Sequence, residues 1–331
     1  MTSTLDLGPI LVTGACGFVG GHLVRRLCGE GRQVRGLVRP GARHSLGETG
    51  ATLIEADIND AVALADAAAG CASVFHLAAV TPAPGLPDKA YRQVNVEGTR
   101  TMLAVCRSSG VRRLVHSSTV GVYGRIRHVP ATERSPTDPS GPYRASKLEG
   151  ERLVREAAAR GEAPAVIVRL TDLMGPGATS WLGLARALAG GGFRLVGGGR
   201  NRNQITFVSD AVEGLVNAAL APEVEGETFL IAGEEAPTVA HIVEVVRRAL
   251  GAPPLAGTLP DWPFRAYVGL GEIVYRRMRR ELPGVQRYGL ALNDKVFSIE
   301  KARRRLGYRP LMPFDEGMAR TIAWYRAEGL V

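Results

Sequence analysis

The sequence has few cysteines, few lysines and no long apolar run. Its four cysteines, in a chain of 331 residues, show no spacing typical of metal ligands, so we expect reduced thiols, a cytoplasmic location and no metal site. No apolar stretch approaches the ~18 residues that a membrane-spanning helix needs, and the first residues do not resemble a signal peptide. These absences favour a globular protein without a membrane span.

Positive charge is plentiful, and it comes almost entirely from arginine. The net charge is +9, and only four of the 41 basic residues are lysines. The arginines are scattered apart from runs at 276–280 and 303–305, and no zinc-finger or RNA-recognition pattern accompanies them. We therefore expect solvated helix faces and no nucleic-acid partner, while some of the charge would suit a nucleotide cofactor.

Strand-like and helix-like segments alternate through the first half of the chain. The candidate strands, rich in Val, Leu and Ile, are 9–13, 33–38, 52–56, 73–77, 112–117 and 165–169. The candidate helices are 18–30, 60–69, 88–108 and 142–160. This alternation predicts an α/β fold, namely a Rossmann-type, doubly wound parallel sheet with helices on both faces.

After residue 170 the pattern changes to glycine-rich loops and helix-like segments. The candidate elements there are helices at 180–190, 209–221, 238–250, 263–281, 298–306 and 314–327 and a strand at 228–232. We expect a dinucleotide-binding domain over 1–170, to which 205–232 returns, and a smaller, mostly helical substrate lobe formed by 171–204 and 233–331. Ligands would bind beyond the carboxyl ends of the strands, between the lobes.

A glycine-rich turn follows the first candidate strand. Gly14, Gly17 and Gly20 lie between the apolar run 10–13 and a helix-like segment. Glycines let the backbone turn sharply and approach a pyrophosphate, which the N-terminus of the following helix attracts. We therefore predict a dinucleotide site in this turn. Its residues are Gly14, Cys16, Gly17, Phe18, Val19 and Gly20.

Tyr143 and Lys147 are four residues apart, so on a helix they share one face. A phenol titrates near ~10, and it needs ~4 kcal/mol of preferential phenolate stabilisation to act as a base near neutral pH. A cation ~4 Å away supplies about that much at an effective dielectric of ~20. We predict that Lys147 lowers the pKa of Tyr143, which acts as acid/base while Thr119 hydrogen-bonds the reacting oxygen. The alternative is a helix-face aromatic beside a solvated lysine.

These motifs, in this order, resemble the extended short-chain dehydrogenase/reductase family, also called the NAD-dependent epimerase/dehydratase family. The resemblance covers essentially the full length of the chain. Besides the glycine turn and the Tyr143/Lys147 pair, it rests on 56–58, 75–79, 95–99, 117–119, 122–124, Arg169 with 175–176, and 306–310.

The resemblance implies a bound nicotinamide dinucleotide and a role for each matching residue. The residues that would border its adenine, ribose and pyrophosphate are Asp57, Ile58, Leu77, Ala78 and Ala79. Lys147 would bind the nicotinamide ribose, and Asn95 would be a structural member of the active-site network. Family members often dimerise through two long helices, here 88–108 and 142–160, so the resemblance implies a homodimer.

The end of the second candidate strand bears on the choice of cofactor. NAD-selective members usually carry an acidic residue there, which hydrogen-bonds the ribose 2′-hydroxyl. This chain has Val38 followed by Arg39, with Arg43 nearby. A guanidinium without an adjacent acid suits a 2′-phosphate, so we favour NADP(H) over NAD(H).

Departures from the family pattern narrow the substrate. Val120 and Gly121 follow Thr119 where nucleotide-sugar dehydratases carry Asp-Glu, and Asp172 stands where an epimerase contacts the substrate diphosphate, which a carboxylate would repel. The residues expected to contact the substrate are Thr119, Val120, Tyr143 and Asp172. The apolar segment 260–270 would either roof a pocket or pack between the lobes. In these features the chain is similar to the hydroxysteroid dehydrogenases and dihydroflavonol reductases of the family.

Three functions remain open at this point. The first is an oxidoreductase that transfers hydride between nicotinamide and a secondary alcohol or ketone of a small organic molecule. The second is a nucleotide-sugar 4-epimerase with tightly bound NAD. The third is a non-catalytic, dinucleotide-sensing regulator, against which the presence of both Tyr143 and Lys147 argues.

Overall fold

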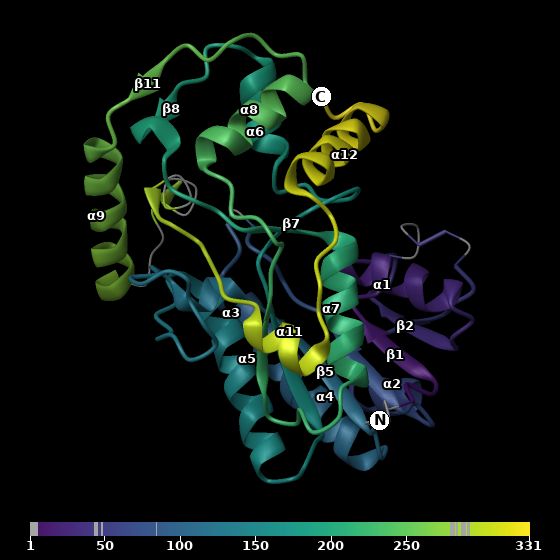
Figure 1. Cartoon of the computed structure of the whole chain (residues 1–331). Coiled ribbons are helices and arrows are strands. Elements are labelled where there is room, and N and C mark those ends of the chain that lie inside the picture. The colour runs from purple at the N-terminus through teal and green to yellow at the C-terminus, as the bar shows by residue number, and fades with distance from the viewer. Residues whose placement is uncertain are drawn as a thin grey trace.

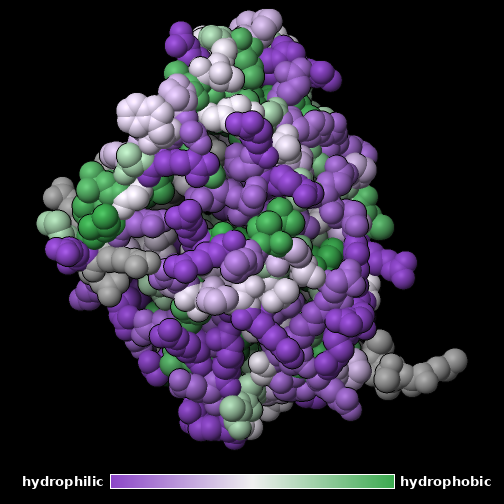
Figure 2. All heavy atoms as spheres, turned by 60° about the vertical axis from the view of Figure 1, so that its left-hand side comes forward, coloured by the Kyte–Doolittle hydropathy of each residue, from purple (hydrophilic) through white to green (hydrophobic). Residues whose placement is uncertain are grey.

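The computed structural model describes residues 6–42, 46–47, 49–83, 85–278, 282, 284–285, 289 and 292–331. Within these ranges no helix combines the length and the apolar character that a bilayer crossing requires. The surface that Figure 2 presents is mostly hydrophilic, with separate hydrophobic patches.

The centre of the molecule is a seven-stranded sheet in the order β3-β2-β1-β4-β5-β6-β10 (Figure 1). Its strands, all parallel, are β1 (Ile10–Thr13), β2 (Val34–Val38), β3 (Thr52–Glu55), β4 (Ser73–His76), β5 (Arg113–Thr119), β6 (Ala165–Leu170) and β10 (Thr228–Ile231). Inner strands such as β1, β4 and β6 are buried along their whole length, which explains the apolar residues at their centres. The order of the strands reverses between β1 and β4. The predicted doubly wound fold is confirmed, and such a reversal is where open α/β sheets bind ligands.

Helices cover both faces of the sheet. On one face, α1 (Phe18–Gly29) and α7 (Val208–Leu220) share a hydrophobic core with the strands. On the other face, α2 (Ala61–Ala68), α4 (Gly98–Ser108) and α5 (Pro142–Ala159) share a second core. A further helix, α11 (Glu300–Leu306), packs against α7 and β10.

The prediction of a single helix over 88–108 is wrong for the middle of that segment. The chain forms α3 (Asp88–Arg92), then one π-helical turn (Gln93–Glu97), and then α4. The side chain of Asn95, inside that turn, hydrogen-bonds the backbone of Val80 in both directions. Widened turns of this kind re-aim side chains and are frequent at functional sites. A contact outside the segment therefore decides the local geometry.

The second lobe has a core of its own above the sheet (Figure 1). Its main helices are α6 (Leu182–Ala189), α8 (Val239–Ala249) and α12 (Phe314–Ala327). Two pairs of short strands accompany them, β7 (Asp172–Met174) with β9 (Ile205–Phe207) and β8 (Leu195–Val196) with β11 (Thr258–Leu259). The mostly helical lobe is confirmed, whereas its division into 171–204 and 233–331 stays a prediction.

Most of the aromatic segment 260–270 belongs to α9 (Trp262–Met278), which lies at the outer edge of the second lobe (Figure 1). Trp262 is 70% exposed and Leu270 is 52% exposed. These two side chains are therefore mostly open to solvent in this structure.

Candidate active site

The glycine turn joins β1 to α1 at the point where the strand order reverses. Gly14 has φ +68°, and a Cβ there would lie 2.9 Å from the backbone nitrogen of Ala78. A Cβ on Gly20 would lie 2.1 Å from the carbonyl oxygen of Gly14. Gly17 is the N-cap residue of α1, and because it has no side chain it offers no acceptor to the first N–H groups of the helix. This close-packed turn at an uncapped helix N-terminus fits a pyrophosphate.

The loop after β4 is fixed beside the glycine turn by a buried threonine. Thr13 Oγ1 accepts hydrogen bonds from the backbone nitrogens of Leu77 (3.2 Å) and Ala78 (3.1 Å). The same hydroxyl lies 2.9 Å from Nδ1 of His76, whose Nε2 lies 3.1 Å from Thr99 Oγ1. Burial lowers the pKa of His76 to about 3, so this ring stays neutral. Ala79 follows in the same loop, which is thus held where the resemblance expects the cofactor.

The residues expected near the adenine lie after β2 and β3. Arg39 is exposed directly after Val38, the last residue of β2. Asp57 is exposed after β3, and its carboxylate accepts a hydrogen bond from the backbone nitrogen of Asn59 at 2.8 Å. Ile58 is buried, and a Cβ on Gly98 would lie 2.9 Å from its side chain. Arg43 lies outside the described residues.

The carboxyl end of β5 and the first turns of α5 carry the proposed acid/base group. Thr119 is the last residue of β5, and its hydroxyl accepts a hydrogen bond from Gly121 N at 3.1 Å. Lys147 is 4% exposed, and its ammonium donates to the carbonyl oxygen of Ser117 at 2.6 Å. This bond fastens the face of α5 that carries Tyr143 to the strand end that carries Thr119. The structure therefore brings Lys147 to the end of β5 that carries Thr119, and Tyr143 lies one turn earlier on the same helix.

The electrostatic state of Tyr143 differs from the sequence-based expectation. Burial raises the pKa of Tyr143 to about 12; the charge of Arg144 opposes that rise and the charge of Asp172 adds to it. Burial also lowers the pKa of Lys147 to about 8, against an upward influence of Glu151. The prediction that Lys147 lowers the pKa of Tyr143 is therefore wrong for this structure. The ammonium is directed at Ser117, and the desolvation of the phenol dominates.

Asn95 uses its whole amide group to hold this region together. Its Oδ1 accepts from Val80 N at 2.8 Å, and its Nδ2 donates to Val80 O at 3.1 Å and to Ser146 Oγ at 2.9 Å. Ser146 in turn donates to the carbonyl oxygen of Tyr143 at 2.7 Å. Asn95 therefore joins the loop after β4 to the first turns of α5. Ser146 was not predicted, although it lies inside the Tyr143/Lys147 motif.

A buried ion pair lies on the same face of α5, one turn beyond Lys147. Glu151 accepts two hydrogen bonds from Arg169 of β6, at 2.9 and 2.7 Å, and one from Ser118 of β5 at 2.6 Å. Arg169 also donates to the hydroxyl of Tyr123 at 2.7 Å. The resemblance singled out Arg169. Glu151 was not predicted, because no motif near it in the sequence indicates that it pairs with Arg169. The pair ties α5 to two strands that end at the site.

Asp172 begins β7 at the edge of the second lobe, and it has a partner that was not predicted. Lys295 Nζ lies 3.1 Å from Asp172 Oδ2, across 123 residues of sequence. Its ammonium offsets the carboxylate, which weakens the argument that Asp172 repels a diphosphate. Val120 is 6% exposed and begins the short 3₁₀ turn after β5 (Val120–Tyr123).

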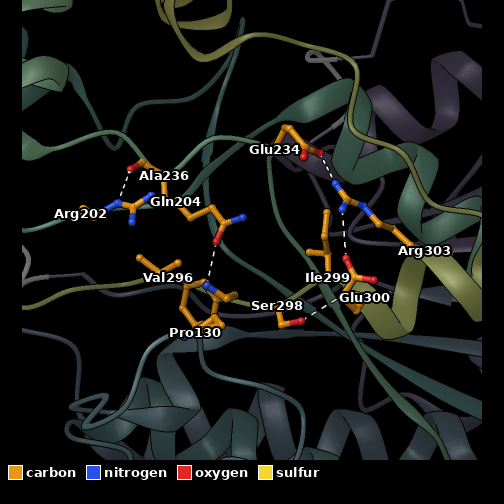
Figure 3. A pocket seen from close by; sticks show the side chains of 11 residues that line it. Pro130, Arg202, Gln204, Glu234, Ala236, Val296, Ser298, Ile299, Glu300 and Arg303 are labelled. Atoms are coloured by element: carbon orange, nitrogen blue, oxygen red, sulfur yellow. Dashed lines mark hydrogen bonds and ion pairs between the residues drawn. The ribbon is translucent and has the colours of Figure 1, made fainter.

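A polar cavity of about 260 Å³ lies between the segment 296–300, α11 and the residues before β9 (Figure 3). Arg303 in its wall pairs with Glu234 and Glu300, and Arg202 donates to the carbonyl oxygen of Ala236 at 3.0 Å. None of the predicted site residues lines this cavity. It is therefore separate from the candidate active site.

The fold and the site together define a dinucleotide-dependent enzyme. Residues 10–232 match the NAD dependent epimerase/dehydratase family, and the chain belongs to that family. A 2-alkyl-3-oxoalkanoate reductase of Stenotrophomonas maltophilia is 33% identical over 95% of this chain and 98% of its own. A UDP-glucose 4-epimerase of Mycolicibacterium smegmatis is 30% identical over 96% of this chain and 98% of its own. The structure of MoeE5 in complex with UDP-glucuronic acid and NAD matches with a TM-score of 0.76 and 29% identity, covering 97% of this chain and 100% of MoeE5.

Proposed function

We propose that the protein is a nicotinamide-dependent oxidoreductase that reduces the ketone of a 3-oxo acid to a secondary alcohol. The observation that carries the proposal is the 2.6 Å bond from Lys147 to Ser117 O, which fastens to the end of β5 the face of α5 on which Tyr143 also lies. When bound, the reduced nicotinamide supplies the hydride. Thr119 orients the substrate oxygen, Tyr143 gives that oxygen its proton, and Lys147 binds the nicotinamide ribose. The resemblance to a 3-oxoalkanoate reductase supports the substrate class.

The protonation state of Tyr143 supports the reductive direction. With a pKa of about 12, the phenol keeps its proton throughout the neutral range. A group that holds its proton is ready to protonate the oxyanion that forms on a ketone, because general acid catalysis needs the acid form. Oxidation of the alcohol needs the phenolate instead, and the positive charge of an oxidised nicotinamide ring would favour that form.

The experiment that tests this function is a turnover assay with purified protein, NADPH or NADH, and a freshly prepared 2-alkyl-3-oxoalkanoic acid. We expect loss of reduced-nicotinamide absorbance in step with formation of the 3-hydroxy acid. A protein that leaves 3-oxo acids unchanged and interconverts UDP-glucose and UDP-galactose would contradict the proposal.

We further propose that NADP(H) is preferred over NAD(H), because Arg39 is exposed after β2 where NAD-selective relatives carry an acid. Arg39→Ala is expected to weaken NADPH binding by about 10- to 100-fold, the usual loss for one charge-assisted hydrogen bond, and to leave NADH binding nearly unchanged. Calorimetric titration with both dinucleotides measures this effect. Arg32→Ala, at the opposite end of β2, is the matched control. Equal weakening of NADPH and NADH would contradict the assignment.

A second candidate function is the nucleotide-sugar 4-epimerase. It is supported by the UDP-glucose 4-epimerase relative and by the ion pair that offsets the charge of Asp172. An epimerase would release NAD on denaturation and would consume no added cofactor during turnover. Turnover of either kind would rule out the third candidate, a non-catalytic dinucleotide sensor.

We also propose a cytoplasmic homodimer joined through the region of α4 and α5. None of the four cysteines forms a disulfide, which agrees with a reducing compartment. The two helices pack side by side on one face of the sheet. A sedimentation mass of two chains would agree with this assembly, and a mass of one chain would contradict it.

A further inference from the structure

A chain of buried hydrogen bonds connects the loop after β4 with the π-helical turn that carries Asn95. Its side chains are Thr13, His76 and Thr99, all of them buried. Thr13 is the last residue of β1, His76 is the last residue of β4, and Thr99 lies in the first turn of α4. The proposed reaction uses none of these three side chains, so their shared hydrogen bonds call for an explanation of their own.

The hydrogen bonds of Thr13 fix the direction of this chain at one end. A hydroxyl group has two lone pairs and one proton. The lone pairs of Thr13 Oγ1 accept from the backbone nitrogens of Leu77 and Ala78, at 3.2 and 3.1 Å. The proton is therefore left for Nδ1 of His76, which lies 2.9 Å away. It follows that Nδ1 is the unprotonated nitrogen of the His76 ring.

The hydrogen bonds of Thr99 require the same tautomer at the other end. The hydroxyl of Thr99 donates to the carbonyl oxygen of Asn95 at 2.8 Å, so its oxygen is available as an acceptor. Nε2 of His76 lies 3.1 Å from that oxygen and therefore carries the proton. With the opposite tautomer, Thr13 Oγ1 would face three N–H donors, and the Thr99 hydroxyl would have to leave Asn95. The low pKa of His76, about 3 through burial, agrees with a neutral ring.

The chain ends at the residue that joins the loop after β4 to α5. Asn95 hydrogen-bonds the backbone of Val80 in both directions, and its amide also donates to Ser146 in the first turns of α5. The loop is thus held at two points, by Thr13 at its start and by Asn95 at Val80. His76 connects these two anchors through the interior of the protein.

We propose that His76, in its Nε2–H tautomer, is a positioning residue that couples the loop after β4 to the turn that carries Asn95. The inference rests on the proposed function, in which Ala78 borders the dinucleotide, and it extends that function by naming the residue that joins the cofactor side of the site to α5. A shift of the loop changes the hydrogen bonds of Thr13, and His76 transmits that change to Asn95. Dinucleotide binding and the alignment of α5 therefore depend on each other.

Thr99→Val tests this coupling, because valine has a shape similar to threonine and removes the acceptor for Nε2–H of His76. We expect NADPH affinity to fall by about 5- to 50-fold, within the usual range for coupled sites, although Thr99 is not a predicted cofactor contact. Thr99→Ser keeps the hydroxyl and should retain most of the affinity. Thr101→Val is the matched control, because Thr101 donates to the carbonyl oxygen four residues earlier in the same way but is exposed. Calorimetric titration without substrate measures all four proteins.

Nitrogen-15 NMR of the histidine-labelled wild type tests the tautomer without any change in the chain. We expect the His76 ring, identified by the signals that His76→Gln lacks, to show a protonated Nε2 and an unprotonated Nδ1 at neutral pH. A protonated Nδ1, in either a neutral or a charged ring, would overturn the proposal.

The remaining results also decide the proposal. If Thr99→Val binds NADPH as tightly as Thr101→Val, or if Thr99→Ser loses as much affinity as Thr99→Val, the coupling through the hydroxyl is refuted. If the wild type binds neither NADPH nor NADH, the proposed function fails, and the coupling is then judged by amide hydrogen exchange. Faster exchange at Leu77 and Ala78 in Thr99→Val, but not in Thr101→Val, supports it, whereas unchanged exchange overturns it.

Discussion

Replacing Tyr143 by phenylalanine is expected to lower kcat for ketone reduction by about 10²–10⁴-fold, the usual contribution of a positioned general acid. The substitution removes only the phenolic hydroxyl, so the ring still packs near Tyr91, at 6.4 Å between centroids. The pyrophosphate and adenine contacts lie elsewhere, on the glycine turn and after β2 and β3. Dinucleotide affinity should therefore hardly change. Steady-state kinetics and a fluorescence titration with NADPH measure the two quantities.

Tyr91→Phe is the matched control for this experiment. It makes the same chemical change on a neighbouring ring, whose hydroxyl contacts the backbone of Ala83. We expect kcat to remain close to that of the wild type. If Tyr143→Phe retained turnover within a small factor of Tyr91→Phe, the assignment of Tyr143 as proton donor would be wrong, and a different group would have to protonate the alcohol.

The parts of the site that could be predicted from sequence are those encoded within a few residues. The glycine turn needs glycine at two of its positions because Gly14 has a positive φ and Gly20 has no room for a Cβ. Tyr143 and Lys147 share a helix face because they are one turn apart. The alternation of apolar runs with helix-like segments likewise predicted the parallel sheet, because the buried strands of such a sheet are largely apolar in sequence.

The remaining features depend on contacts between distant segments. Lys295 meets Asp172 only after the chain has folded, and no spacing pattern joins residues 123 positions apart. The π-helical turn around Asn95 forms against the loop at Val80, so helix periodicity alone predicted one continuous helix. The pKa of Tyr143 follows from its burial, and the sequence-based argument that the charge of Lys147 lowers this pKa therefore predicted a shift in the wrong direction.

The second large effect is expected from Arg169→Met, which should lower the free energy of unfolding by about 3–5 kcal/mol, as is typical when one partner of a buried ion pair is removed. The side chains of Glu151 and Arg169 are 0% and 2% exposed. The substitution leaves the Glu151 carboxylate in the core with Ser118 and Arg155 as its remaining partners among the described residues. Urea unfolding measures the loss. Arg320→Met, which breaks an exposed pair with Glu316, is the control and should have little effect.

The pH dependence of this effect follows from the pKa of Glu151. Burial alone would raise that pKa, but the hydrogen bonds and charges of Arg169, Ser118 and Arg155 outweigh burial, and the pKa lies below its ordinary value of 4.5. A carboxylate with a depressed pKa in the folded state stabilises that state above the ordinary pKa and loses this contribution as pH falls through the lower value. The difference between the wild type and Arg169→Met should therefore narrow below pH 4.5.

A double variant separates the cost of an unpaired charge from the net value of the pair. Replacing Glu151 and Arg169 together by leucine removes both charges, so it should cost less than the sum of the two single replacements. The difference is the coupling energy. A double variant as unstable as that sum would mean that the two side chains stabilise the fold independently, through packing against β5 and β6. In that case the ion pair would not be what joins α5, with Tyr143 and Lys147, to the sheet.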